Sequence, residues 1–278
     1  MTRRVLFLSL SLLAVLLAGL VGLVWLVFPT SGPTPSSPPP AGADVPALAV
    51  QEESSAAPDP SDWRLTLVNP WTPLPEGFQP QLATVTGGYQ VDQRCAGPLE
   101  AMLAACRAAG HRPVLCSAYR TQEKQDSLYQ ALVTKRQAQG LSLAQAQESA
   151  ATEVAVPGTS EHQLGLAVDL VDASYQTLDS RQADTPAQKW LMAHSWEYGF
   201  ILRYPTDKSD VTGIIYEPWH YRYVGRDYAR QICESGLCLE EWLDKRQEAR
   251  AVESAIAAGL EDARRRAYRA LWHQKAGT

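Results

Sequence analysis

Hydrophobic and polar residues follow two different periods between residues 63 and 244. Several segments repeat apolar residues every three to four positions, which predicts helices at residues 98–110, 121–140, 142–155, 185–199 and 225–236. Shorter apolar or alternating runs predict strands at residues 63–68, 112–120, 165–172, 199–205 and 213–224. Strands and helices do not alternate regularly along the chain. We therefore expect an α+β fold, with a small antiparallel sheet flanked by helices.

Residues at the ends of the predicted helices support these boundaries. Thr121 and Ser142 stand where an N-cap is expected, because a hydroxyl group there accepts a hydrogen bond from a free backbone N–H. Gly110 and Gly199 follow two of the helices, as glycine commonly does at a helix C-terminus. Pro186 lies in a first turn, where its missing N–H is not needed.

The first 28 residues form a separate segment. Residues 5–28 carry no charge and are long enough to cross a hydrocarbon core about 30 Å thick. Arg3 and Arg4 precede this run and the next basic residue is Arg64, so we expect the rest of the chain to lie outside the cytoplasm. The prediction is a single-pass transmembrane helix that anchors the chain in the cell membrane. A cleaved signal peptide is the alternative, although its apolar region is normally shorter.

Two further segments flank the predicted folded domain at residues 63–244. Residues 29–62 are rich in Pro, Ser and Ala and show no apolar periodicity, which predicts an extended linker. Residues 245–278 are rich in Ala, Arg and Glu and have a thin apolar face. We expect them to form a helical or disordered tail.

Charge and cysteine content limit the remaining possibilities. The formal net charge of −5 gives no support for nucleic-acid binding. The chain has five cysteines, an odd number, and an oxidising environment outside the cytoplasm permits disulfides. Cys106–Cys116 and Cys233–Cys238 are the candidate bridges. No cysteine spacing resembles that of a zinc site.

A carboxylate interrupts the apolar run at residues 165–172. Burying the charge of Asp169 there costs several kcal/mol unless a partner offsets it. His162 precedes it by seven residues, and a turn at Gly165 allows the two side chains to converge before the strand begins. An ion pair with a buried arginine is the alternative partner for Asp169. Asp172 has the opposite strand parity, and we expect it to be solvated or to cap a helix.

A second acid and histidine lie three residues apart in the aromatic segment "YEPWHYRYVG". This spacing allows Glu217 and His220 to face one cavity. Together with His162 and Asp169, His220 gives two imidazoles and one carboxylate, a set that leaves one position open on tetrahedral zinc, as hydrolysis requires. Glu217 then remains free to take a proton from water. The four residues predict a catalytic zinc site.

Arg120 is the candidate substrate-binding residue. It follows a predicted strand and precedes a capped helix in "CSAYRTQEKQ", where its side chain can face a cleft. A guanidinium group can grip a carboxylate through two parallel hydrogen bonds. An ordinary surface arginine is the alternative.

Three motifs resemble those of the VanY-type D-alanyl-D-alanine carboxypeptidases. They are "SAYRTQEKQ", "PGTSEHQLGLAVDLVD" and "GIIYEPWHYRYVG", and the resemblance extends from about Leu65 to Leu243. It implies a zinc D,D-carboxypeptidase that removes the terminal D-Ala from peptidoglycan stem peptides, with the small fold shared by Hedgehog proteins and D,D-peptidases. The residues before Leu65 and after Lys245 lie outside the resemblance.

The resemblance also implies roles for individual residues. His162, Asp169 and His220 would bind one zinc ion, and Glu217 would act as the general base and then as the acid. Arg120 would bind the terminal carboxylate or the developing oxyanion of the substrate. Ser160 and Gln125 would assist in substrate binding.

Two other functions compete with this one. An L,D-carboxypeptidase could use the same zinc site on tetrapeptide stems, and the motifs do not distinguish the two specificities. A non-catalytic wall-binding module could keep the fold, but it would need neither Glu217 nor a complete set of zinc ligands.

Overall fold

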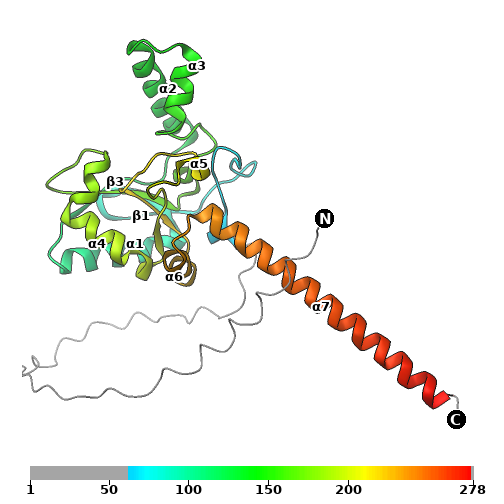
Figure 1. Ribbon diagram of the computed structural model, residues 1–278. Coiled ribbons are helices and arrows are strands. Elements are labelled where there is room, and N and C mark those ends of the chain that lie inside the picture. Colours follow the sequence, from blue (N-terminus) through cyan, green and yellow to red (C-terminus); the bar gives the residue numbers. More distant parts are fainter. Residues whose placement is uncertain (1–61, 277–278) are drawn as a thin grey trace, which may run out of the picture. The chain divides into compact units, whose positions relative to one another are not determined.

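The computed structural model describes residues 62–276, with side chains to residue 266 (Figure 1). The main sheet is antiparallel with the strand order β3-β4-β6-β5. Its strands are β3 (Pro113–Ser117), β4 (Ala167–Asp172), β5 (Phe200–Leu202) and β6 (His220–Tyr223). A separate antiparallel pair joins β1 (Leu82–Thr84) to β2 (Gln90–Asp92). The predicted mixture of helices with a small antiparallel sheet is confirmed.

The described residues also form seven α-helices. They are α1 (Gln93–Ala108), α2 (Gln122–Ala138), α3 (Leu143–Ala151), α4 (Pro186–His194), α5 (Ser209–Thr212), α6 (Arg226–Ser235) and α7 (Leu239–Ala276). Short 3-10 turns are η1 (Trp63–Leu65), η2 (Thr86–Gly88), η3 (Glu161–Leu164), η4 (Ser180–Asp184) and η5 (Ser195–Tyr198). The helices α2 and α3 pack against each other and stand out from the rest of the domain (Figure 1).

The predicted caps form as expected. The side chain of Thr121 accepts a hydrogen bond from the backbone N–H of Lys124 at the start of α2. Ser142 and Gln145 form a reciprocal capping box at the start of α3. Gly199, with φ of 86°, ends the turn that follows α4.

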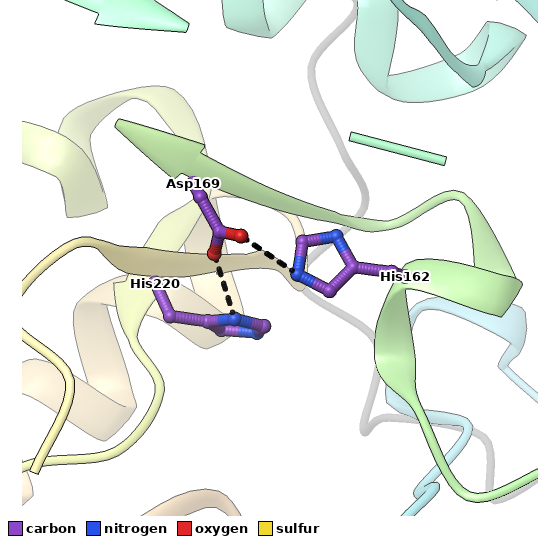
Figure 2. A group of neighbouring side chains, drawn as sticks. All are labelled: His162, Asp169 and His220. Carbon is purple, nitrogen blue, oxygen red and sulfur yellow. Dashed lines mark ion pairs between the residues drawn. The ribbon is translucent and has the colours of Figure 1, made fainter. Parts of the chain in front are cut away.

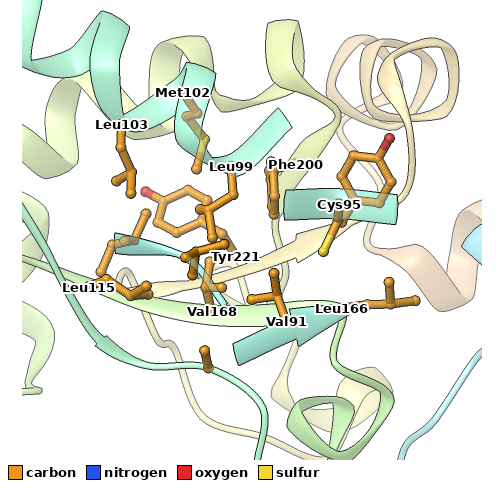
Figure 3. Packing of buried hydrophobic residues seen from close by; sticks show 14 of the residues in the cluster. Val91, Cys95, Leu99, Met102, Leu103, Leu115, Leu166, Val168, Phe200 and Tyr221 are labelled. Carbon is orange, nitrogen blue, oxygen red and sulfur yellow. The ribbon is translucent and has the colours of Figure 1, made fainter. Parts of the chain in front are cut away.

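The core holds β4 in place. The α1 side chains Leu99, Met102 and Leu103 are fully buried and pack with Val168 of β4 (Figure 3). Leu170 of β4 belongs to the same buried cluster. Burial of each such side chain contributes about 1.5–3 kcal/mol. Because side chains alternate along a strand, the residue between Val168 and Leu170 points to the opposite face. That residue is Asp169. Core packing on one face of β4 therefore places the Asp169 carboxylate on the opposite face.

Three details differ from the sequence-based predictions. The predicted strand at residues 63–68 is wrong, because Asp62 caps the turn η1 there through the backbone N–H of Arg64. The last strand is limited to His220–Tyr223 within the predicted 213–224. Asp172 is buried rather than solvated, and its carboxylate accepts hydrogen bonds from Ser174 and from the backbone N–H of Ala187 in α4. Its predicted capping role is therefore correct.

Neither candidate disulfide is present. All five cysteines lie in the described part of the chain and carry free thiols. Cys106 is buried in the α1 core, whereas the Cys116 thiol on β3 donates to the backbone carbonyl of Asp169. Burial raises the pKa of Cys116 to about 12, which keeps this thiol protonated.

The predicted anchor (1–28) and most of the linker (29–62) lie outside the described residues. Within residues 62–276, no helix combines the length and hydropathy that a membrane span requires. Helix α7 crosses the predicted domain boundary at residue 244 without a break.

Candidate active site

Strand register brings the first two site residues together. The strands β4 and β6 pair so that Asp169 lies directly across from His220. Directly opposed residues project from the same face of an antiparallel sheet. Nδ1 of His220 consequently lies 3.1 Å from Oδ1 of Asp169.

A left-handed turn brings in the second imidazole. The 3-10 turn η3 carries His162 and ends at Gly165, whose φ is 74°. This turn reverses the chain before β4, so Nε2 of His162 lies 3.2 Å from Oδ2 of Asp169 (Figure 2). The other ring nitrogen of His162, Nδ1, contacts the backbone carbonyl of Ala118 at 2.7 Å. Because a carbonyl oxygen only accepts, Nδ1 carries the proton and Nε2 presents its lone pair to the site.

The three side chains form a donor set that suits a metal ion. One ligand atom from each of His162, Asp169 and His220 lies within 4.8 Å of the others, and all three residues are buried. Oδ1 of Asp169 is buried without a hydrogen-bond partner among the described residues. The Asp169 carboxylate lies between two imidazoles and has one buried oxygen without a partner, which a zinc ion would satisfy, since zinc takes nitrogen and oxygen ligands of these types.

Glu217 lies beside this set. One of its carboxylate oxygens is 3.7 Å from Nδ1 of His220, and a tight turn joins the two residues through the backbone. Burial raises the pKa of Glu217 to about 8, and the neighbouring charge of Asp169 adds to this effect. A carboxyl group with such a pKa can accept and return a proton near neutral pH.

The pKa values of the two histidines are shifted in opposite directions. Burial lowers the pKa of His162 to about 4, helped by the positive charge of Arg120. Burial also lowers the pKa of His220, but its contacts with Asp169 and Glu161 outweigh this and raise the pKa to about 9. A dication at the site would replace the proton on His220, because a ligating imidazole must be neutral.

Arg120 forms an ion pair with Asp169, which is the alternative that the sequence left open for this carboxylate. Its Nη2 donates to Oδ2 of Asp169 at 2.8 Å, and its Nε donates to Ser117 at 2.9 Å. The carboxylate thus faces one guanidinium and two imidazoles at the same time. The Arg120 side chain is 16% exposed, so it is less deeply buried than the Asp169 side chain that it contacts.

The structure places Gln125 against Arg120 and Ser160 two residues before His162. Gln125 is fully buried, and its Oε1 accepts from Nη1 of Arg120 at 3.4 Å while its Nε2 donates to the carbonyl of Ala155. Gln125 therefore supports Arg120. Ser160 is buried directly before η3 and its backbone carbonyl accepts from Gln163. The substrate-binding roles of both residues stay predictions.

A buried charge cluster behind His220 was missed from the sequence. Glu161 accepts hydrogen bonds from Arg203 and Arg222, and Arg203 also pairs with Glu240 of α7. Two arginines inside the apolar strand segments "GFILRYP" and "HYRYV" were the available signal, because a buried arginine requires an acidic partner.

Comparisons with known proteins agree with this geometry. The sequence model of the VanY family, described as D-alanyl-D-alanine carboxypeptidase, matches residues 88–226, which include the five residues of the site from Arg120 to His220. A D-alanyl-D-alanine carboxypeptidase of Enterococcus faecalis is 44% identical over 187 residues, covering 67% of this chain and 68% of that protein.

Solved structures show the same similarity. The vancomycin resistance D,D-pentapeptidase VanY from a VanB-type resistance cassette, crystallised with Zn(II), is 43% identical with a TM-score of 0.60, covering 66% of this chain and 99% of that chain. The LdcB LD-carboxypeptidase is 32% identical with a TM-score of 0.58, covering 66% and 86%. The resemblance, the enzyme class and the zinc cofactor predicted from the motifs are confirmed. The chain belongs to the VanY family of D-alanyl-D-alanine carboxypeptidases and is an enzyme with a site for zinc.

Proposed function

We propose that this protein is a D,D-carboxypeptidase that removes the terminal D-alanine from peptidoglycan stem peptides ending in D-Ala-D-Ala. The observation that carries the proposal is the convergence of His162, Asp169 and His220 within 4.8 Å, beside the buried Glu217. The similarity to D-alanyl-D-alanine carboxypeptidases supports the same substrate.

We assign the zinc ion to His162, Asp169 and His220. Zinc in a three-ligand site supplies a Lewis acid that activates water and polarises a carbonyl group. The protein supplies the proton transfers. Glu217 accepts a proton as water forms a new C–O bond at the carbonyl carbon of the penultimate residue. It then donates that proton to the amine of D-alanine as the C–N bond breaks.

Arg120 has a place in the same reaction. Its Nη2 donates to Asp169 and its side chain is 16% exposed, and we assign its guanidinium to the terminal carboxylate or the developing oxyanion of the substrate. Gln125 and Ser117 hold the guanidinium in one orientation. Ser160, which is buried directly before η3, is assigned a hydrogen bond to the substrate.

Two variants test the assignment of base and ligand. Glu217→Gln keeps all three ligands, so zinc should stay bound at about one ion per chain while turnover falls by roughly 10²–10⁴-fold. His220→Ala leaves two protein ligands, so both zinc and turnover should be lost. Zinc content by atomic spectroscopy and D-Ala release are measured together. Loss of zinc from Glu217→Gln, or full zinc in His220→Ala, would show that these roles are wrongly assigned.

The second candidate is an L,D-carboxypeptidase, which the similarity to LdcB favours. The D,D assignment is preferred because identity to the D,D enzymes is higher, at 43–44% against 32%. Purified enzyme is offered pentapeptide and tetrapeptide muropeptides separately. D-Ala release from the pentapeptide alone supports the D,D assignment, and release from the tetrapeptide alone replaces it with the L,D assignment.

We also propose that residues 1–28 anchor the enzyme in the cytoplasmic membrane, with the catalytic domain at residues 63–244 outside. The uncharged run at residues 5–28 and the preceding Arg3 and Arg4 support this. Peptidoglycan would then be within reach across the linker. N-terminal sequencing of the mature protein tests the anchor, which is refuted if the chain begins after residue 28.

A further inference from the structure

One buried carboxylate oxygen faces a metal-ligand imidazole from outside the proposed ligand set. Glu161 has a fully buried side chain, and its Oε2 lies 3.6 Å from Nε2 of His220. Neither atom has a hydrogen-bond partner among the described residues. A separation of 3.6 Å is slightly longer than a hydrogen bond, and the two buried, unpartnered atoms face each other across it.

The carboxylate of Glu161 is held in this orientation by two arginines. Its Oε1 accepts from Nε of Arg203 at 2.7 Å and from Nη1 of Arg222 at 2.8 Å. Arg203 is fixed in turn by Glu240, through hydrogen bonds of 2.8 and 2.6 Å. Arg222 also donates from Nε to the backbone carbonyl of Tyr223 and from Nη2 to that of Thr66. With Oε1 occupied by two donors, Oε2 is directed at His220.

The contact with Glu161 bears on which ring nitrogen of His220 carries the proton. A neutral imidazole has one N–H and one lone pair, so a ligating ring must carry its proton on the nitrogen away from the metal. Nδ1 of His220 faces Asp169 at 3.1 Å, so we assign Nδ1 as the nitrogen that would bind zinc. The proton must then be on Nε2, which faces Glu161. His162 is arranged the other way round, because its Nδ1–H is held by the carbonyl of Ala118.

We propose that Glu161 is a positioning residue of the zinc site: its Oε2 accepts the Nε2–H of His220 and thereby fixes the tautomer that presents Nδ1 to the metal. The proposal rests on the assignment of His220 as a zinc ligand. Carboxylates that hold ligating histidines in this way are generally worth 10–100-fold in metal affinity.

The substitution Glu161→Gln tests this directly. The two arginines require an acceptor, so the amide oxygen takes the place of Oε1 and the amide N–H₂ faces His220. Nε2 of His220 then faces an N–H donor, which favours the tautomer with the proton on Nδ1. In that tautomer Nδ1 has no lone pair available for zinc. Glu161→Gln should weaken zinc binding by roughly 10–100-fold. The affinity is measured in the full-length protein by competition with a chromophoric chelator.

Glu240→Gln is the matched control. It removes one negative charge from the same buried cluster, also at a contact with Arg203, but it does not touch His220. Like Glu161→Gln, it should destabilise the metal-free protein. Its zinc affinity should stay within about threefold of wild type, in contrast to the roughly 10–100-fold loss expected for Glu161→Gln. Equal losses of zinc affinity in both variants, or no loss in Glu161→Gln, overturn the positioning role.

A spectroscopic readout keeps the test decisive if Glu161→Gln fails to fold. In zinc-loaded wild-type protein labelled with ¹⁵N-histidine, His220 should show a protonated Nε2 and a non-protonated Nδ1. The reverse pattern overturns the proposal. The variant His220→Ala distinguishes an error in the role of Glu161 from an error in the zinc-ligand assignment. If His220→Ala still binds zinc fully, the ligand assignment fails; if it loses zinc while Glu161→Gln binds normally, only the role of Glu161 fails.

Discussion

Two carboxyl groups at the site, Asp169 and Glu217, take different protonation states because their neighbours differ. Burial raises the pKa of Asp169, but the imidazoles of His162 and His220 and the Arg120 guanidinium outweigh this and hold it well below its usual range. Glu217 has weaker compensation, so burial dominates and its pKa rises to about 8. A pair of carboxyl groups with separated pKa values provides one permanent anion and one proton carrier.

The raised pKa of Glu217 predicts a pH-dependent loss of stability in the metal-free protein. The ordinary pKa of 4.5 applies when the chain is unfolded, and about 8 when it is folded. The contribution of Glu217 is fully present below pH 4.5 and is lost as pH rises through 8, at up to about 1.4 kcal/mol per pH unit. Glu217→Gln lacks this titration. Its stability relative to wild type, from urea unfolding with a chelator present, should increase between pH 5 and pH 8. A constant difference would contradict the prediction.

Arg120→Lys separates charge from geometry at the substrate-binding position. An ammonium group keeps the positive charge near Asp169 but cannot form two parallel hydrogen bonds to a carboxylate. We expect kcat/KM to fall by an amount equivalent to roughly 2–5 kcal/mol, with zinc affinity changed far less. Arg136→Lys, in α2 and paired with Glu153, is the control. If Arg120→Lys loses zinc and keeps its kcat/KM per bound ion, Arg120 acts on Asp169 and not on the substrate.

At the scale of elements, the turn from η3 into β4 decides whether the site forms. Gly165 adopts φ of 74°, and a Cβ atom there would meet the backbone nitrogen of Asp92 at 2.9 Å. That nitrogen donates to the carbonyl of Gly165, so the turn and the start of α1 are joined at this point. Glycine is required both for the left-handed conformation and for the close approach.

Gly165→Ala should therefore cost more than backbone strain alone. Gly236→Ala is the matched control, because Gly236 also has a positive φ, of 66°, but open space around its Cβ position. The control should lose about 1–2 kcal/mol of unfolding free energy. Gly165→Ala should lose more and should also weaken zinc binding, because the turn sets His162 relative to Asp169. Thermal unfolding and chelator competition measure both effects. Equal destabilisation with unchanged zinc affinity would show that the turn tolerates a side chain.

At the scale of the whole molecule, the sequence was informative where a pattern is local. Helical periodicity and capping residues predicted α2, α3 and α4, and the glycine between His162 and Asp169 predicted the turn that joins them. Residues 63–68 alternate like a strand, but a cap at Asp62 forms a local turn instead. Local hydrogen bonding there outweighs a weak strand preference.

The parts that were not predicted depend on contacts between distant segments. Glu161 lies 42 residues from Arg203 and 61 from Arg222, and no local spacing relates them. The strand register that opposes Asp169 to His220 is likewise a property of the folded sheet. The motifs therefore predicted the residues that converge in the candidate site, whereas the buried charges next to them required the three-dimensional structure.

Burial along α7 predicts where the folded domain ends. Leu239 and Trp242 are buried in the core and Glu240 pairs with Arg203, whereas residues 254–266 are exposed. A chain ending at Glu253 should keep the wild-type unfolding free energy to within about 0.5 kcal/mol and should keep its activity. A chain ending at Cys238 loses two core side chains and leaves Arg203 poorly compensated, which should cost more than about 3–5 kcal/mol. Urea unfolding and D-Ala release compare both with the full-length chain. A marked loss of stability in the chain ending at Glu253 would place the rest of α7 within the domain.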